Sequence, residues 1–206
     1  MTSTRSLVRA DASVAILSPR PLRGEDKLRA ALDSFGVDVT GRICLDVGAS
    51  AGGFTLVLIE RGAAKVIAAD AGHGQLRGFL RAHSRVMSLE RTNLADLGRV
   101  APRCWDIEVI TMDLSYLSVA EAVPQLEGLR LSPRAELIAL VRPMFELRLG
   151  LPPVDDRRLT EALDRARRGV ERHGRWVVAH TMPSPVPGAR GAREWLLHGR
   201  RIDRRP

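Results

Sequence analysis

Apolar positions along the chain alternate between short continuous runs and longer stretches with helical spacing. The runs predict seven strands, at residues 43–47, 65–70, 85–89, 106–112, 136–141, 175–181 and 194–198. Helical spacing predicts helices at residues 25–35, 54–59, 118–126 and about 157–172. Because strands and helices alternate, the pattern predicts a parallel, doubly wound α/β sheet with helices on both faces.

The chain length and apolar content suit a single folded unit. With 206 residues and 45% hydrophobic content, the chain is long enough for one full core. Residues 1–22 contain Pro19 and Pro21 and show no clear periodicity. We therefore expect an N-terminal arm over residues 1–22 and one domain over residues 23–206.

Residues 43–55 combine a buried strand, a glycine-rich turn and the start of a helix. Gly48, Gly52 and Gly53 allow the backbone to pass close to a ligand, whose polar groups can meet the free N–H groups at the helix start. A tight turn without any ligand is the alternative interpretation of the same glycines. The order of strand, turn and helix favours a nucleotide-type binding site.

Asp46 distinguishes between two classes of cofactor that use such a turn. Nicotinamide and flavin sites use Gly-x-Gly-x-x-Gly, and here Ser50 stands at the second glycine position. A carboxylate at the end of the strand repels a pyrophosphate and attracts a cationic amino group. S-Adenosylmethionine carries an ammonium and a sulfonium and has no phosphate, so Asp46 favours this cofactor.

Four further polar residues follow predicted strands at their carboxyl ends. Asp70 comes 22 residues after Gly48, where it is placed for ribose hydroxyls, and a simple turn-forming aspartate is the alternative. Ligands of parallel sheets bind at the carboxyl ends of the strands. We therefore expect Asn93, Asp113 and Arg142 at the same edge as Asp70, with Asn93 as a candidate contact for adenine.

The formal net charge of +8 allows a polyanionic partner, with nucleic acid as the first candidate. Nearly all the positive charge is arginine, because Lys27 and Lys65 are the two lysines of the chain. A compositional bias without any phosphate binding therefore explains the charge equally well. The sequence leaves both interpretations open.

The sequence predicts no membrane-spanning segment, no signal peptide and no metal-binding motif. No apolar run approaches the roughly 18 residues that span a bilayer, and charged residues interrupt residues 1–20. Cys44 and Cys104 lack the paired spacing of a zinc or redox motif. We expect a cytoplasmic protein without a metal site.

Several segments, taken together, resemble the FtsJ-like ribose 2′-O-methyltransferases, in the haemolysin-A (TlyA-type) branch of ribosomal RNA methyltransferases. In chain order they are GEDKLRAALDSFGVDVTGRICLDVGASAGGFT, IAADAGHGQL, LERTN, TMDLSYLS, LVRPMFE and AREWLLH, over residues 24–198. Members of this branch typically carry an N-terminal RNA-binding module. Since 26 residues precede Lys27, we expect this chain to lack that module.

The resemblance implies a class I methyltransferase fold, a Rossmann-like sheet of seven strands whose last strand is antiparallel. It also implies S-adenosylmethionine as the cofactor. The cofactor contacts that we expect lie on the glycine-rich turn and at the strand ends, namely Asp46, Gly48, Ala49, Ser50, Gly52, Gly53, Phe54, Asp70, Asn93 and Asp113.

The catalytic set of the family, Lys-Asp-Lys-Glu, falls on Lys27, Asp113, Arg142 and Glu194. Arg142 departs from the family, which has lysine there. Lysine can lose its proton when desolvated, whereas arginine stays charged, so Arg142 cannot be a general base. The resemblance then implies that Lys27 or a water accepts the proton, that Arg142 stabilises an oxyanion or holds a phosphate, and that the two acids orient them.

Three functions remain open at this point. The first is methylation of a ribose 2′-hydroxyl in ribosomal RNA. The second is methylation of a small molecule whose acceptor needs little or no base, and Arg142 would then suit an acidic acceptor. The third is binding of the cofactor or RNA without catalysis.

Overall fold

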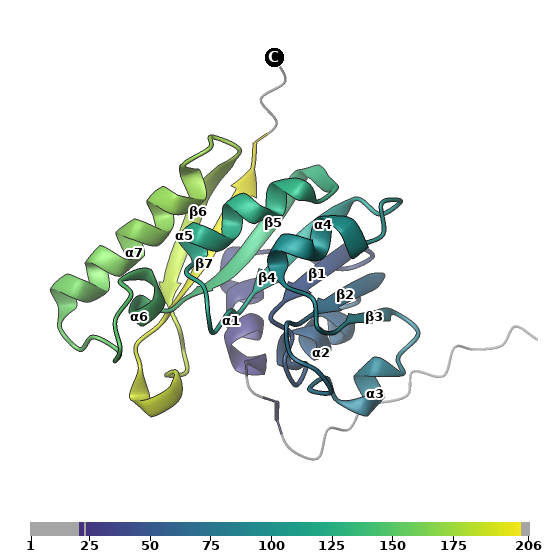
Figure 1. Ribbon diagram of the computed structural model, residues 1–206, viewed down its shortest axis with the longest axis horizontal. Helices are drawn as coiled ribbons and strands as arrows, with labels where there is room; N and C mark the ends of the chain where they lie inside the picture. Colours follow the sequence, from purple (N-terminus) through teal and green to yellow (C-terminus); the bar gives the residue numbers. More distant parts are fainter. Residues whose placement is uncertain (1–20, 23, 203–206) are drawn as a thin grey trace, which may run out of the picture.

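The computed structural model describes residues 21, 22 and 24–202, which form a seven-stranded sheet with helices on both faces (Figure 1). The strands are β1 (Ile43–Val47), β2 (Lys65–Ala69), β3 (Val86–Leu89), β4 (Ile107–Met112), β5 (Leu131–Val141), β6 (Trp176–Pro183) and β7 (Trp195–Arg201). Their order in the sheet is β3-β2-β1-β4-β5-β7-β6. The first five strands pair in parallel, and β7 runs antiparallel to both of its neighbours. The expected class I fold with an antiparallel last strand is confirmed.

Two layers of helices cover the sheet. The α-helices are α1 (Glu25–Phe35), α2 (Gly53–Glu60), α3 (Gly78–Arg81), α4 (Leu97–Val100), α5 (Val119–Ala122), α6 (Pro143–Glu146) and α7 (Asp156–Glu171). Three short 3-10 helices are η1 (Leu94–Asp96), η2 (Val123–Gly128) and η3 (Ala189–Gly191). Helices α1 and α2 pack on one face, whereas α4, α5 and α7 lie over the other (Figure 1).

Strand β1 shows how alternate side chains feed the two cores. Leu45 and Val47 belong to the cluster under α5 and α7, while Cys44 belongs to the cluster under α1 and α2. Successive side chains of a strand point to opposite faces, so a strand covered on both faces is apolar almost throughout. The exception in β1 is Asp46, which shares the face of Cys44 and is buried all the same.

Two predicted boundaries are wrong for identifiable reasons. The helix expected over residues 118–126 ends as an α-helix at Ala122 and continues as the 3-10 helix η2, because Pro124 has no N–H to extend the α-helical ladder. Strand β5 begins at Leu131 rather than at residue 136, since Pro133 and Arg134 interrupt the apolar pattern without ending the strand.

Two further expectations from the sequence concern the N-terminal arm and membrane-spanning segments. The expected N-terminal arm lies outside the described residues, apart from Pro21 and the buried Leu22. No described helix combines the length and the apolar character that a membrane crossing requires.

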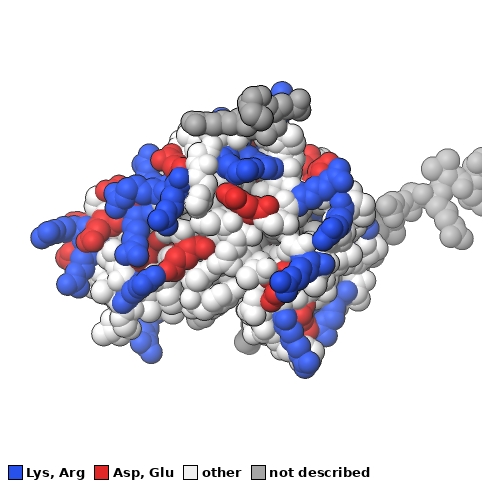
Figure 2. All heavy atoms as spheres, turned by 45° about the horizontal axis from the view of Figure 1, so that its top comes forward, with Lys and Arg blue, Asp and Glu red and all other residues white. Residues whose placement is uncertain are grey.

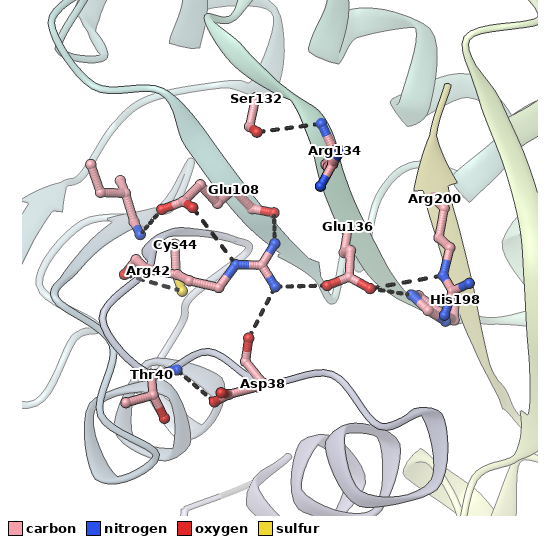
Figure 3. Close-up of polar contacts among 11 residues, drawn as sticks. Asp38, Thr40, Arg42, Cys44, Glu108, Ser132, Arg134, Glu136, His198 and Arg200 are labelled. Atoms are coloured by element: carbon pink, nitrogen blue, oxygen red, sulfur yellow. Dashed lines mark hydrogen bonds and ion pairs between the residues drawn. The ribbon is translucent and has the colours of Figure 1, made fainter. Parts of the chain in front are cut away.

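At the amino ends of the strands, Arg42 ties three of them together (Figure 3). Its guanidinium donates to the Glu136 carboxylate of β5 at 2.7 Å and to the Glu108 backbone carbonyl of β4 at 2.8 Å. Glu136 also contacts Nε2 of the buried His198 at 3.1 Å. Hydrogen bonds from His198 and Arg42 lower the pKa of Glu136 to about 2. This end of the sheet is thus closed by paired charges.

Helices α5 and α7 approach each other closely at Gly169, which generates a test of the packing. A methyl group added at Gly169 would lie 2.3 Å from Cα of Ala120. Gly169→Ala is therefore expected to lower the free energy of unfolding, since overpacking costs about 1–3 kcal/mol and helix propensity returns at most about 1 kcal/mol. Thermal and urea unfolding measure the change.

The matched control is Gly78→Ala in α3, where no atom lies within 4 Å of the added methyl group. This variant should be as stable as the wild type or slightly more stable. If Gly169→Ala behaved like the control, the close approach of α5 and α7 would be wrong.

Candidate active site

A cavity of about 400 Å³ lies where the carboxyl ends of β1, β2 and β4 meet the segments that follow them. Eight of the residues singled out from the sequence line it, namely Gly48, Ala49, Ser50, Gly53, Phe54, Asp70, Asp113 and Arg142. Volumes of about 300–1,000 Å³ are typical of sites for small molecules and cofactors. The strand ends predicted to share one edge therefore do enclose a space of the right size.

The turn after β1 needs its glycines for two different reasons. Gly48 has φ +84°, and a methyl group there would lie 2.4 Å from the carbonyl oxygen of Asp113. Gly52 does not line the cavity; it has φ +102°, and its missing side chain leaves room for Leu80. The turn thus lets β1 approach the end of β4 closely and places the first residues of α2, Gly53 and Phe54, at the cavity.

Asp70 is held in one orientation at the end of β2. Its carboxylate accepts hydrogen bonds from the backbone N–H of Ser50 at 2.7 Å and of Gly72 at 2.6 Å. Gln75 contacts the Ser50 hydroxyl at 3.1 Å. These bonds link the glycine-rich turn to the loop after β2, so both walls of the cavity meet at Asp70.

Asp46 does not line the cavity, contrary to the expectation of a direct contact with the cofactor's ammonium. It is 1% exposed, and its carboxylate accepts hydrogen bonds from the hydroxyls of Thr55 at 2.6 Å and Thr111 at 2.9 Å. Burial raises the pKa of Asp46 to about 6, although both threonine hydrogen bonds act in the opposite direction. The side chain points back toward α2 because it lies on the β1 face that α2 covers.

The segment after β3 places the two neighbours of Asn93, the candidate adenine contact, at the cavity. Asn93 is exposed and is not among the lining residues, whereas its neighbours Thr92 and Leu94 are. Ser115 and Tyr116 also line the cavity, and the sequence analysis assigned them no role. Their position directly after Asp113, at the end of a predicted strand, was the available signal.

The four residues of the expected catalytic set form one continuous line of charges. Lys27 Nζ lies 2.5 Å from Oε2 of Glu194, and Nε of Arg142 lies 3.6 Å from Oε1 of the same carboxylate. Arg142 also donates to Oδ1 of Asp113. Lys27 and Glu194 are separated by 167 positions in the chain and are 9% and 6% exposed. The structure thus brings together all four residues.

Three elements position this line. Lys27 belongs to α1, which packs against β7, and Glu194 directly precedes β7. Arg142 follows β5 and caps α6. A methyl group at Gly188 would lie 2.2 Å from the Glu194 carboxylate, so the loop before β7 closes over that acid. Neither Lys27 nor Glu194 lines the cavity, whereas Asp113 and Arg142 do.

A family model described as FtsJ-like methyltransferase matches residues 22–201. The chain belongs to the FtsJ-like methyltransferase family. Over 187 residues it is 43% identical to the 16S/23S rRNA (cytidine-2′-O)-methyltransferase TlyA of Mycobacterium tuberculosis, a match that covers 85% of this chain and 66% of that relative. The chain therefore spans just under two thirds of that relative's length.

Solved structures agree with this assignment of fold and family. A hemolysin-like protein of Streptococcus thermophilus superposes with a TM-score of 0.82 at 31% identity, covering 88% of this chain and 66% of that one. An S-adenosylmethionine-dependent methyltransferase of Mesorhizobium loti has a TM-score of 0.60 at 20% identity, with 84% and 96% covered. The second likeness shows the class I methyltransferase fold alone.

Glu146 is a buried acid of this FtsJ-like domain to which the sequence analysis assigned no role. It is 1% exposed, and its carboxylate accepts a hydrogen bond from the backbone N–H of Val119 at 2.6 Å. Burial raises the pKa of Glu146 to about 7. Because Val119 is the first residue of α5, Glu146 fixes α6 against the start of that helix and so fixes the segment next to Arg142.

The buried Asp46 makes the stability of this FtsJ-like domain depend on pH. Because the folded pKa is raised from about 3.8 to about 6, the contribution of protonated Asp46 is complete below the lower value and is lost as the pH rises through the higher one. Relative to Asp46→Asn, the wild type's free energy of unfolding should fall by on the order of 3 kcal/mol across this window.

Urea unfolding of both proteins at several pH values from about 4 to about 7 measures this difference. Using the difference between two variants removes the other titrating groups, which both proteins share. A constant difference between wild type and Asp46→Asn would contradict the assignment of a buried, titrating carboxylate.

Proposed function

We propose that this protein is an S-adenosylmethionine-dependent methyltransferase that acts on a ribose 2′-hydroxyl of ribosomal RNA. The observation that carries the proposal is the line of Lys27, Glu194, Arg142 and Asp113, whose last two members line the cavity at the strand ends. The name of the Mycobacterium tuberculosis relative, an rRNA cytidine-2′-O-methyltransferase, supports the same substrate class. A ribosomal substrate implies a cytoplasmic enzyme, and we propose residues 23–206 as its methyltransferase domain.

The residues around the cavity fit S-adenosylmethionine. The N–H groups at the start of α2 suit the carboxylate of its amino acid part, and the oriented acid Asp70 suits the ribose diol. The cavity is lined by two acids, Asp70 and Asp113, and by Arg142, whose charge is already paired. A cation without phosphate therefore matches the cavity better than a pyrophosphate does. When bound, this cofactor supplies an electrophilic methyl group.

The arrangement around Arg142 weighs against an acidic small-molecule acceptor. The guanidinium of Arg142 donates to Asp113 and lies 3.6 Å from Glu194, so two carboxylates already flank it. A further carboxylate from an acceptor would have to displace one of them. A neutral hydroxyl meets no such repulsion, which favours the ribose over an acid.

Each side chain of the line has a defined task in this proposal. Arg142 holds Asp113 in place and stabilises negative charge that develops on the acceptor oxygen. Glu194 fixes Arg142 and the ammonium of Lys27 at the same time. Lys27 in turn balances the charge of Glu194 in a nearly buried place, where an unpaired acid would be costly.

The surface charge is compatible with RNA without identifying where RNA binds. Figure 2 shows arginine and lysine side chains spread over the face that it displays, with acidic side chains between them on the side of α7. Helix α7 itself carries acids such as Glu161 and Asp164 among its arginines. We therefore assign RNA binding to no single helix and propose that the net charge of +8 acts as a general attraction.

Cofactor binding is the first test of this proposal. The wild type is expected to bind S-adenosylmethionine in calorimetry, and Gly48→Ala should bind at least about tenfold more weakly, because the methyl group collides with the Asp113 carbonyl. Gly78→Ala serves as the control for an alanine without a collision. Tight binding of NAD in place of S-adenosylmethionine would refute the cofactor assignment.

The acceptor is tested with cofactor carrying a labelled methyl group, incubated with ribosomal RNA or with a metabolite extract. Label is expected in RNA. Affinity for RNA should fall steeply with salt, since each neutralised single-strand phosphate adds about 0.7 to the log–log slope. Label confined to the small-molecule fraction, or in neither fraction, would support the two functions that the sequence left open.

Substitution of Arg142 tests its place in the reaction. Arg142→Lys restores a side chain that can lose its proton, so RNA methylation should rise, most visibly at alkaline pH. The wild type, measured over the same pH series, is the control. The ribose assignment would be contradicted by an Arg142→Lys variant that does not methylate RNA and that methylates a small acid more slowly than the wild type does.

A further inference from the structure

We infer that the carboxylate of Asp113 accepts the proton of the acceptor hydroxyl. The family has lysine at position 142, and the arginine found here cannot take that role. This inference rests on the proposed function, because it requires a hydroxyl as the methyl acceptor. It goes beyond that function by assigning the base, which the sequence analysis left to Lys27 or a water.

Three of the four charged residues are excluded by their chemistry or their position. Arg142 lines the cavity, but a guanidinium keeps its proton throughout the working pH range. Lys27 does not line the cavity, and its Nζ lies 2.5 Å from Glu194, which stabilises the charged ammonium. Glu194 is 6% exposed and does not line the cavity either.

Asp113 meets the geometric requirements of a base. It lines the cavity, and Arg142 donates to its Oδ1. Among the described residues no donor contacts Oδ2, so one oxygen is held and the other is available to a ligand. Asp70 is the other acid of the lining, but both of its oxygens already accept backbone N–H groups.

The step balances with this assignment. The acceptor oxygen forms a bond to the methyl carbon, the carbon–sulfur bond breaks, and its electron pair goes to the sulfur, which becomes a neutral thioether. The hydroxyl proton passes to Asp113 Oδ2 and then to solvent. An oxygen that is gaining a third bond becomes strongly acidic, so a carboxylate can take its proton.

This assignment predicts how the rate depends on pH. Arg142 contacts Asp113 directly, and Asp46 on β1 is close enough to interact with its charge. Asp70 and Tyr116 line the same cavity. Glu194 and Lys27 are connected to Asp113 by way of Arg142. The pKa of Asp46 is raised to about 6, and burial raises the pKa of Tyr116 above its usual value near 10. Between these values the rate of a carboxylate base should be flat.

The experiment measures single-turnover methylation of ribosomal RNA from about pH 7 to about pH 9.5 with three proteins. The wild-type rate should be independent of pH. Asp113→Asn should be slower by at least about 100-fold, and its residual rate should rise about tenfold per pH unit as hydroxide replaces the lost base. Lys27→Arg keeps its charge beside Glu194, so it should lose no more than about tenfold and keep a flat profile.

A second readout does not depend on turnover. Because Lys27 and Lys65 are the two lysines of the chain, NMR of the side-chain nitrogens of labelled lysine resolves the state of Lys27. The internal control is Lys65, which is half-buried and donates to the Ser84 carbonyl. In the wild type bound to S-adenosylhomocysteine, the Lys27 ammonium signal should persist over the pH range in which the rate is flat. Thermal unfolding of each variant checks that the fold is retained.

Several outcomes would overturn the inference. The first is a wild-type rate that rises with pH together with loss of the Lys27 ammonium signal. The second is a Lys27→Arg variant as slow as Asp113→Asn. The third is a pH-independent residual rate in Asp113→Asn, which would limit the role of Asp113 to holding Arg142. All three leave RNA methylation by the wild type intact, so the proposed function would survive them. Absence of any RNA methylation by the wild type would remove the proposed function and this inference together.

Discussion

The buried carboxylate of Asp46 is the contact on which the binding edge of this protein depends. Through the hydroxyls of Thr55 and Thr111 it joins β1 to the first turn of α2 and to β4, and the ends of these three elements line part of the cavity. A buried acid is costly unless its oxygens are hydrogen-bonded, so the two threonines can hardly move away. The glycine-rich turn is thereby held between β1 and α2, and its residues Gly48, Ala49 and Ser50 line the cavity.

The line of charges formed by Lys27, Glu194, Arg142 and Asp113 depends on a second constraint, the packing of α1 against β7. That contact brings Lys27 next to Glu194, although the two residues are 167 positions apart in the sequence, and it leaves Glu194 nearly buried. Arginine at position 142 fits this arrangement because its planar fork contacts Asp113 and approaches Glu194 at the same time. A lysine would present a single ammonium there. Arginine at this position thus preserves the line of charges, and its guanidinium keeps its proton.

The two ends of the sheet differ in how their charged side chains are used. At the amino ends, Arg42 joins Glu108 and Glu136, and His198 packs its ring against Phe35 with ring centroids 5.4 Å apart. These charges are satisfied within the protein (Figure 3). At the carboxyl ends, Asp113 and Arg142 lie beside an open cavity. Ligands of parallel sheets bind at this second end because the loops there are free to vary over a fixed frame.

The sequence determined the elements and the edge, because both depend on local patterns. Apolar runs indicated every strand of the sheet, and acids after strands indicated Asp70 and Asp113 as residues of the cavity. Resemblance to the family added the antiparallel β7 and placed Lys27 and Glu194 in one set of residues, which no local pattern contains. Their direct ion pair came from the structure.

Only the tertiary structure decided where individual side chains point. Asp46 was expected to meet a ligand, but its place on the β1 face under α2 directs it to Thr55 and Thr111. Asn93 was expected in the cavity, and the bend into η1 brings in Thr92 and Leu94 instead. A pattern of residue types records which side chains are polar. The direction of each one is set by the strand face and by the backbone angle of the turn, both of which depend on what packs against them.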